Sequence, residues 1–234
     1  MKHYYRKYGV IGISIILIIF CLIALDEPGQ SLEHYISLLY NRAYFISIYL
    51  LVFLLGVIPI SSKLFVTEMV TRFKDKFLLT LSFHKQLFIY CIYYSGTYLL
   101  TNILVALFFS PNKYFISVVY FGFLLVAFLI QTVGWYYIGS LFLLICTWCK
   151  NTAITYFLTV IIVGITASVG YTSTYIQFKY YLSVHEIMYM FFYIDYWVKI
   201  LMYTIYYILL SAAFLWIMYM ILKRTNLIKR INGK

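Results

Sequence analysis

Charged residues are scarce in this sequence, and their scarcity indicates the class of protein. Only 11% of the 234 residues are charged, while 65% are hydrophobic. A soluble domain has about 25% charged and about 45–50% apolar residues, and a soluble fold of this length could not bury so much apolar surface. We therefore expect lipid to be the main solvent, with one transmembrane domain over residues 1–234 and no large soluble domain.

Short strands of alternating polarity are also lacking. Within lipid, only α-helices and closed β-barrels satisfy every backbone hydrogen bond, and a barrel would require such alternating strands. The sequence has instead long apolar runs that are separated by short polar stretches. These runs predict an all-α, polytopic membrane protein.

Six apolar runs are long enough for a helical span of about 20 residues. No small-x-small cleavage site follows the first run, so we expect it to be retained as a span. The fourth run is too long for one straight span, and we expect it to tilt or to break near Gln131 and Gly134. The expected spans lie in Tyr8–Leu25, Ala43–Ile60, Leu87–Ser110, Ile116–Trp148, Ala153–Tyr175 and Ile200–Leu222.

Basic residues are distributed unequally over the two sides of these spans. With the N-terminus inside, fourteen of the eighteen Lys and Arg residues lie on the cytoplasmic side, and four lie outside. The positive-inside rule then predicts a multi-pass protein of the cell membrane with both termini in the cytoplasm. Topology and attraction to anionic inner-leaflet lipid explain the net charge of +11, so we expect no nucleic-acid partner.

Motifs for catalysis and nucleotide binding are absent. The sequence has no G-x-x-x-x-G-K-[ST] loop, no H-E-x-x-H and no G-x-S-x-G. The chain therefore cannot bind ATP through a P-loop, and we do not expect an enzyme. Cys146 and Cys149 form a C-x-x-C motif, but zinc would need two more ligands. We expect all four cysteines to be ordinary residues in or beside the spans.

The positions of the histidines and of the charged residues indicate neither a metal site nor a site for ion transport. The adjacent His185 and Glu186 are expected to form a surface pair rather than a metal site. No charged residue lies deep within an expected span, which disfavours a transporter driven by protons or ions. The histidines fall in different expected loops and are His3, His34, His84 and His185.

The longest expected cytoplasmic segment, Ser61–Gln86, contains an amphipathic pattern. Apolar side chains recur at every fourth residue from Phe65 to Phe77, which places them on one stripe of a helix. Such a helix either floats on the inner membrane surface or docks onto a cytoplasmic protein. The mixed charges beside the stripe, with Glu68 next to Arg72, favour a protein partner.

The longest expected external segment, Gln177–Lys199, is too apolar for a free loop and too polar for a seventh span. We expect short helices that lie in the outer leaflet or dip into it. A seventh span is the alternative, but it would place the basic C-terminal tail outside.

The expected spans carry mild polarity and many of the 27 tyrosines. These side chains either hold neighbouring helices together or line a path for an amphipathic substrate. The candidate path residues are Tyr90, Tyr94, Tyr98, Asn102, Gln131, Tyr203 and Tyr207.

This arrangement resembles the ABC-2 type transporter permeases. The likeness covers the six spans, the amphipathic cytoplasmic helix and the external helices, and it includes Glu68, the pair Leu78-Leu79 and Lys85 before the third span. Two features depart from that pattern: the segment before the first span has only about seven residues, and Thr80 stands where a proline is expected. The small size is similar to that of Gram-positive exporters of bacteriocins and toxic peptides.

The resemblance implies a permease that forms half of a path for apolar or amphipathic peptides. It implies a second permease copy or a paralogue, and ATP with Mg²⁺ on a separate ATPase subunit, with no cofactor on this chain. Two alternatives remain: a six-span substrate-capturing component of an importer, and a membrane enzyme of unknown chemistry. The implied ATPase-coupling residues are Phe65, Glu68, Met69, Arg72, Phe73 and Asp75.

Overall fold

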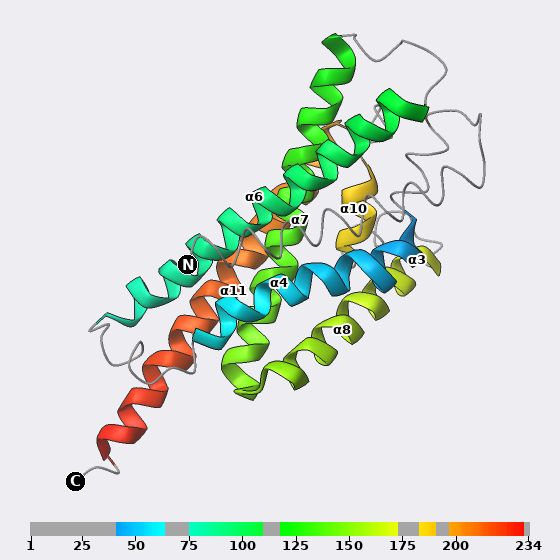
Figure 1. The fold of residues 1–234 in the computed structure, drawn as a ribbon. Coiled ribbons are helices and arrows are strands. Elements are labelled where there is room, and N and C mark those ends of the chain that lie inside the picture. Colours follow the sequence, from blue (N-terminus) through cyan, green and yellow to red (C-terminus); the bar gives the residue numbers. More distant parts are fainter. Residues whose placement is uncertain (1–40, 64–74, 110–117, 173–182, 191–196, 232–234) are drawn as a thin grey trace.

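The computed structural model describes residues 41–63, 75–109, 118–172, 183–190 and 197–231 (Figure 1). Nearly all of these residues are helical, and the described part of the chain contains no β-strand. This confirms the all-α prediction for the described residues. The helices are α3 (Arg42–Tyr44), the π-helix η1 (Phe45–Tyr49), α4 (Leu50–Ser62), α6 (Lys76–Phe109), α7 (Val118–Cys149), α8 (Thr152–Thr172), α10 (Val184–Met190) and α11 (Trp197–Ile231).

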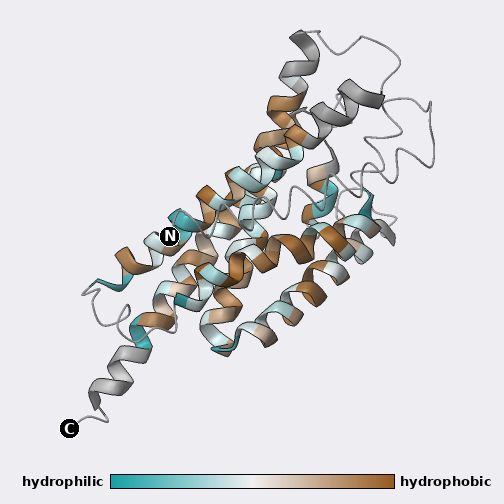
Figure 2. Ribbon diagram, viewed as in Figure 1, coloured by the Kyte–Doolittle hydropathy of each residue, from teal (hydrophilic) through white to brown (hydrophobic). Residues whose placement is uncertain are grey.

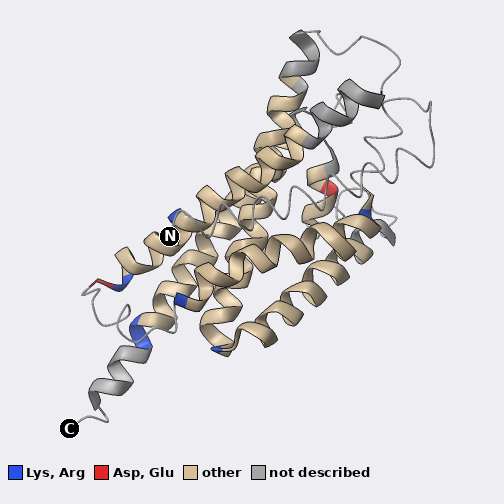
Figure 3. Ribbon diagram, in the orientation of Figure 1, with Lys and Arg blue, Asp and Glu red and all other residues tan. Residues whose placement is uncertain are grey.

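Three of the described segments are long and apolar enough to cross a membrane. They are Arg42–Ser62, Leu124–Cys149 and Val198–Arg224, and they coincide with the second, fourth and sixth expected spans. Apolar residues cover most of these helices (Figure 2), and long stretches carry no charge (Figure 3). The chain therefore has the helices of a membrane protein.

The fourth expected span is one continuous helix. α7 runs without interruption through the middle of the bundle, so the expected alternative of a break near Gln131 and Gly134 is wrong. A continuous helix satisfies all of its internal backbone hydrogen bonds, which lipid would otherwise leave unpaired.

The other three expected spans have different outcomes. α6 contains Leu87–Phe109, and α8 contains an apolar stretch, Thr152–Ser168, that is shorter than the three candidate spans. The first expected span, Tyr8–Leu25, lies outside the described residues. A total of six spans therefore stays a prediction.

α7 is the central helix of the described bundle. It packs against α4, α6, α8, α10 and α11 (Figure 1). Of the most apolar stretch of each helix, 61% is buried inside the bundle in α7, compared with 17% in α11. α11 therefore turns most of its apolar surface outward, as a helix at the lipid boundary does.

α6 begins eleven residues before the expected start of the third span. Asp75 caps the helix, because its Oδ1 accepts a hydrogen bond of 2.8 Å from the backbone N–H of Phe77. Residues 76–86 of the expected cytoplasmic segment Ser61–Gln86 therefore belong to α6, and the cytoplasmic location of the segment stays a prediction. The hydropathy pattern did not indicate this part of the helix, because it contains polar residues such as His84. In the structure His84 is buried among neighbouring side chains.

A tight turn joins α7 to α8, as the sequence predicts. Lys150 adopts a left-handed conformation with φ of 53°, and its N–H bonds to the carbonyl of Cys146 at 3.0 Å. Asn151 then caps α8, because its Oδ1 accepts from the N–H of Ala153 at 2.9 Å. This turn places α7 and α8 side by side and antiparallel.

Candidate functional site

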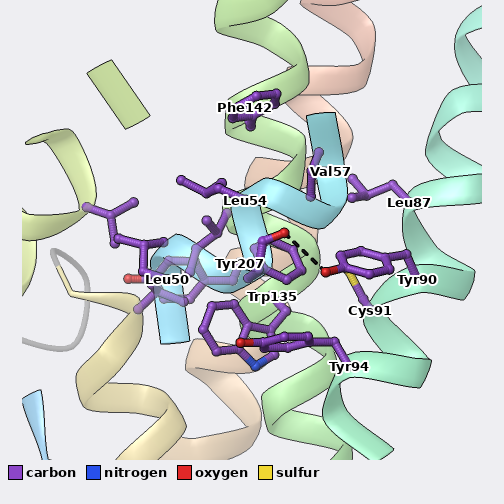
Figure 4. Packing of buried hydrophobic residues seen from close by; sticks show 14 of the residues in the cluster. Leu50, Leu54, Val57, Leu87, Tyr90, Cys91, Tyr94, Trp135, Phe142 and Tyr207 are labelled. Atoms are coloured by element: carbon purple, nitrogen blue, oxygen red, sulfur yellow. Dashed lines mark hydrogen bonds between the residues drawn. The ribbon is translucent and has the colours of Figure 1, made fainter. Parts of the chain in front are cut away.

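An aromatic cluster fills the centre of the bundle where η1, α4, α6 and α7 meet (Figure 4). Trp135 of α7 is fully buried at its centre. The ring centroids of Phe53, Tyr94 and Phe45 lie 4.7, 4.9 and 5.4 Å from that of Trp135. The π-helical turn η1 widens the backbone at this level, and such turns are frequent at functional sites.

The tyrosine face of α6 packs against α4 and η1. Tyr90 Oη donates a hydrogen bond of 3.2 Å to the carbonyl of Phe53 (Figure 4), and Tyr94 Oη donates one of 2.8 Å to the carbonyl of Tyr49. Gly56 makes the first contact possible, because a Cβ at this position would overlap the Tyr90 ring. These two hydroxyls therefore link neighbouring helices.

The structure brings most of the candidate path residues into the packed interior. Those with described side chains are all nearly or fully buried, and Tyr207 packs edge to face on Tyr137 at 4.7 Å. The side chain of Asn102 lies outside the described residues. Their burial agrees with helix packing, and a role in a substrate path stays a prediction. The buried residues are Tyr90, Tyr94, Tyr98, Gln131, Tyr203 and Tyr207.

The short helix α10 lies within the expected external segment and packs onto α7. A Cβ at Gly134 would lie 2.7 Å from Met188 Cγ, so only glycine allows this close approach. Gln131 Nε2 donates a hydrogen bond of 3.4 Å to the Met188 carbonyl. α10 is therefore seated on the middle of α7 rather than lying free.

His185 is buried and Glu186 is partly buried in α10, so the expectation of a surface pair is wrong. His185 Nδ1 lies 3.6 Å from Glu186 Oε1, and the side chains are 7% and 13% exposed. The imidazole also packs on the Phe45 ring at 4.8 Å. α10 thus brings an ionisable pair into the bundle, which a search for charges within the expected spans did not detect.

His84 also departs from its expected place in a loop. It lies in α6 with 2% of its surface exposed, and its Nδ1 is 2.9 Å from Tyr136 Oη of α7. This contact joins the first turns of α6 to the central helix.

The expected ATPase-coupling segment is described only at its two ends. Phe65, Glu68, Met69, Arg72 and Phe73 lie outside the described residues, and Asp75 is exposed at the start of α6.

A hydrogen bond joins the residues on either side of segment 64–74. Lys63, which follows α4, donates a hydrogen bond of 3.2 Å from Nζ to Gln86 Oε1 of α6. Partial burial lowers the pKa of the Lys63 ammonium below its usual range. The two helices that flank residues 64–74 are therefore held together at this end of the bundle.

Within the residues that the structure describes, no group of three His, Cys, Asp or Glu side chains could hold a metal ion. Cys91, Cys146 and Cys149 are free thiols. Trp135 is the central residue that the sequence analysis missed. The available signal was its position four residues after Gln131, on the same face of a buried helix.

Comparison with protein-family profiles, curated proteins and solved structures finds no match for this chain. Its function must therefore be argued from its own residues and their geometry.

Proposed function

We propose that this chain is the permease subunit of an ATP-binding-cassette exporter and forms half of a path for apolar or amphipathic peptides. One observation carries the proposal. The segment 64–74 combines an apolar stripe with mixed charges, and its flanking helices are joined by the hydrogen bond from Lys63 to Gln86. The amphipathic pattern predicts a helix in this segment, and a helix held between two joined ends would be suited to receive force from a cytoplasmic ATPase.

α6 provides a direct route from that segment to the centre of the bundle. It is a continuous helix of 34 residues, and its first turns contact α7 through His84 and Tyr136. Farther along, Tyr90 and Tyr94 bond to backbone carbonyls of α4 and η1. Because a helix moves as a rigid element, displacement of its first turn is transmitted to the aromatic cluster.

The three candidate spans favour an apolar or amphipathic cargo, and the ionisable pair of the bundle, His185 and Glu186, lies on α10 outside these spans. The three candidate spans carry charges only at or near their ends, so a small ion or a strongly charged metabolite would find no counter-charge within them. Tyrosine and tryptophan offer apolar rings with polar edges, which suits a peptide that carries both kinds of group.

The proposed assembly lies in the cell membrane with both termini of this chain in the cytoplasm. ATP and Mg²⁺ bind to separate ATPase subunits, and a second permease copy or a paralogue completes the path. The exposed apolar faces of α8 and α11 contact membrane lipid.

Replacing Phe73 by Asp tests the coupling. The variant places a charge on the apolar stripe, and a cost of about 2 kcal/mol or more is expected at a buried contact, which corresponds to roughly thirtyfold weaker binding. We expect the ATPase that co-purifies with the chain to be lost, while membrane insertion continues.

Thr71→Asp is the matched control, because it adds the same charge to the same segment but on the opposite side of the stripe. The control should retain the ATPase. Equal ATPase recovery from Phe73→Asp and Thr71→Asp would show that the helix only rests on lipid.

A further inference from the structure

Several buried side-chain polar atoms of the described residues have no hydrogen-bond partner in the protein, and three of them lie where α6 packs against α7. These three are Ser95 Oγ of α6, together with Gln131 Oε1 and Trp135 Nε1 of α7. The three residues are 1%, 3% and 0% exposed. We call these residues the polar layer. Unpaired polar groups are rare in folded proteins, because each costs about 1–3 kcal/mol.

The three residues lie within about two turns of one another along the packed helices α6 and α7. Gln131 and Trp135 are four residues apart on α7, so they lie on one face. The register of α6 against α7 follows from two positions: Leu87 packs against Gly139, and a Cβ added at Gly96 would lie 4.0 Å from a Phe128 ring carbon. Because the two helices are antiparallel, this register places Ser95 level with residues 129–131 of α7.

The polar layer presents complementary hydrogen-bonding groups. The Gln131 carbonyl oxygen accepts, the Trp135 indole N–H only donates, and the Ser95 hydroxyl can do both. A ligand that satisfies all three must itself both donate and accept. The backbone amide of a peptide does so, since its N–H suits Gln131 and its carbonyl suits Trp135.

The surroundings of the polar layer suit the apolar side chains of a peptide. Phe45, Phe53 and Tyr94 surround Trp135 with ring centroids within 5.4 Å. α10 closes the layer on one side through the long hydrogen bond from Gln131 to Met188. This contact is at the weak end of the hydrogen-bond range.

We propose that the polar layer is a binding site for the backbone amide of a peptide cargo, reached when α10 leaves α7. This inference rests on the proposed function and extends it by naming the groups that recognise the cargo. Gln131 accepts from a cargo N–H, Trp135 donates to a cargo carbonyl, and Ser95 completes the contact with either group.

Binding of two synthetic peptides to the full chain in lipid nanodiscs tests this site. The probes are a fluorescein-labelled apolar nonapeptide and the same peptide with N-methylated backbone amides, and fluorescence anisotropy reports their affinities. Loss of one hydrogen bond is worth about 1.4 kcal/mol, or tenfold in affinity. The matched control is Trp148→Phe, since Trp148 is 78% exposed.

The proposal predicts a distinct pattern. Gln131→Met should weaken binding of the parent peptide about tenfold and leave the N-methylated peptide unchanged, because that peptide has no N–H to donate. Trp135→Phe should weaken both peptides by a similar factor, because both retain carbonyls. Trp148→Phe should weaken neither peptide. Thermal unfolding of each variant confirms that the chain is folded.

Two other results would overturn the site, and they are distinguishable. If wild type binds both peptides and neither Gln131→Met nor Trp135→Phe changes either affinity, the polar layer holds buried water only, and the proposed function stands. If wild type binds neither peptide while the ATPase still co-purifies, the peptide cargo is wrong together with the site, and the permease assignment stands.

Discussion

Single glycines decide how closely the helices of this bundle approach. Gly56 of α4 lies against the Tyr90 ring of α6, and Gly122 of α7 has no atom within 4 Å of the position of an added Cβ. These two sites therefore offer the same substitution with opposite consequences.

Gly56→Ala should destabilise the chain by about 1–3 kcal/mol, because the added methyl overlaps the Tyr90 ring in a packed interior. Gly122→Ala should be neutral or should stabilise by up to about 1 kcal/mol, since alanine is the better helix former. Thermal unfolding of the two variants in the same detergent measures the difference. Equal melting temperatures would show that Tyr90 is not packed on α4.

At the same scale, the sequence indicated which residues share a face but not what they contact. The spacing of Tyr90, Tyr94 and Tyr98 predicted one common face of a helix, and that face is buried in the structure. Nothing in the local pattern revealed that Tyr94 bonds to the carbonyl of Tyr49, because this partner is 45 residues away. The burial of His185 depends in the same way on a distant residue, Phe45.

Among the elements, the short helix α10 depends most on packing against its neighbours, which are α7, α8 and α11. Its seven residues cannot form a stable helix alone, so packing on α7 around Gly134 must stabilise it. The hydropathy of this segment predicted short helices, and the structure describes one helix within it, α10. The hydropathy pattern could not show that α10 packs on the central helix.

Gly134→Leu should displace α10 from α7, because a larger side chain overlaps Met188. A single cysteine in place of Ser183, which is fully buried, reports the change in a background without native cysteines. We expect labelling by an impermeant thiol reagent to accelerate about tenfold or more, which corresponds to 1.4 kcal/mol of lost docking. Gly122→Leu is the control, and equal labelling rates in the two variants would contradict the docking of α10.

The boundaries of elements were predictable where hydropathy alone sets them. The second and sixth expected spans agree with Arg42–Ser62 and Val198–Arg224 to within a few residues. The start of α6 was missed because its cap, Asp75, and its buried His84 both look like loop residues in a hydropathy profile. At the start of α6, packing against other helices stabilises the helix, rather than contact with lipid.

For the whole molecule, the asymmetry of basic residues predicts the orientation in the membrane. Single cysteines at Asn112 and Asn232, in a background without native cysteines, should label from opposite sides with an impermeant thiol reagent. Asn112 should react on intact cells, and Asn232 only after lysis. Labelling of both from the same side would mean an even number of spans between them and would contradict the predicted topology.

The class of the whole fold followed from composition, because a chain with so little charge has to be solvated by lipid. The function follows less directly. A permease would recognise its ATPase and cargo through small local features, and the proposed coupling segment of this chain carries only a loose pattern around Glu68 and Phe73. The hydropathy and charge pattern of a single sequence gives little indication of which residues contact another subunit.

Purification of the tagged full chain from its native membrane tests the central claim most directly. We predict that an ATPase subunit with a P-loop co-purifies in a defined ratio, and that its hydrolysis of ATP rises when an apolar peptide is added. Recovery of the intact, folded chain without any ATPase would contradict the assignment as a permease of an ATP-driven exporter.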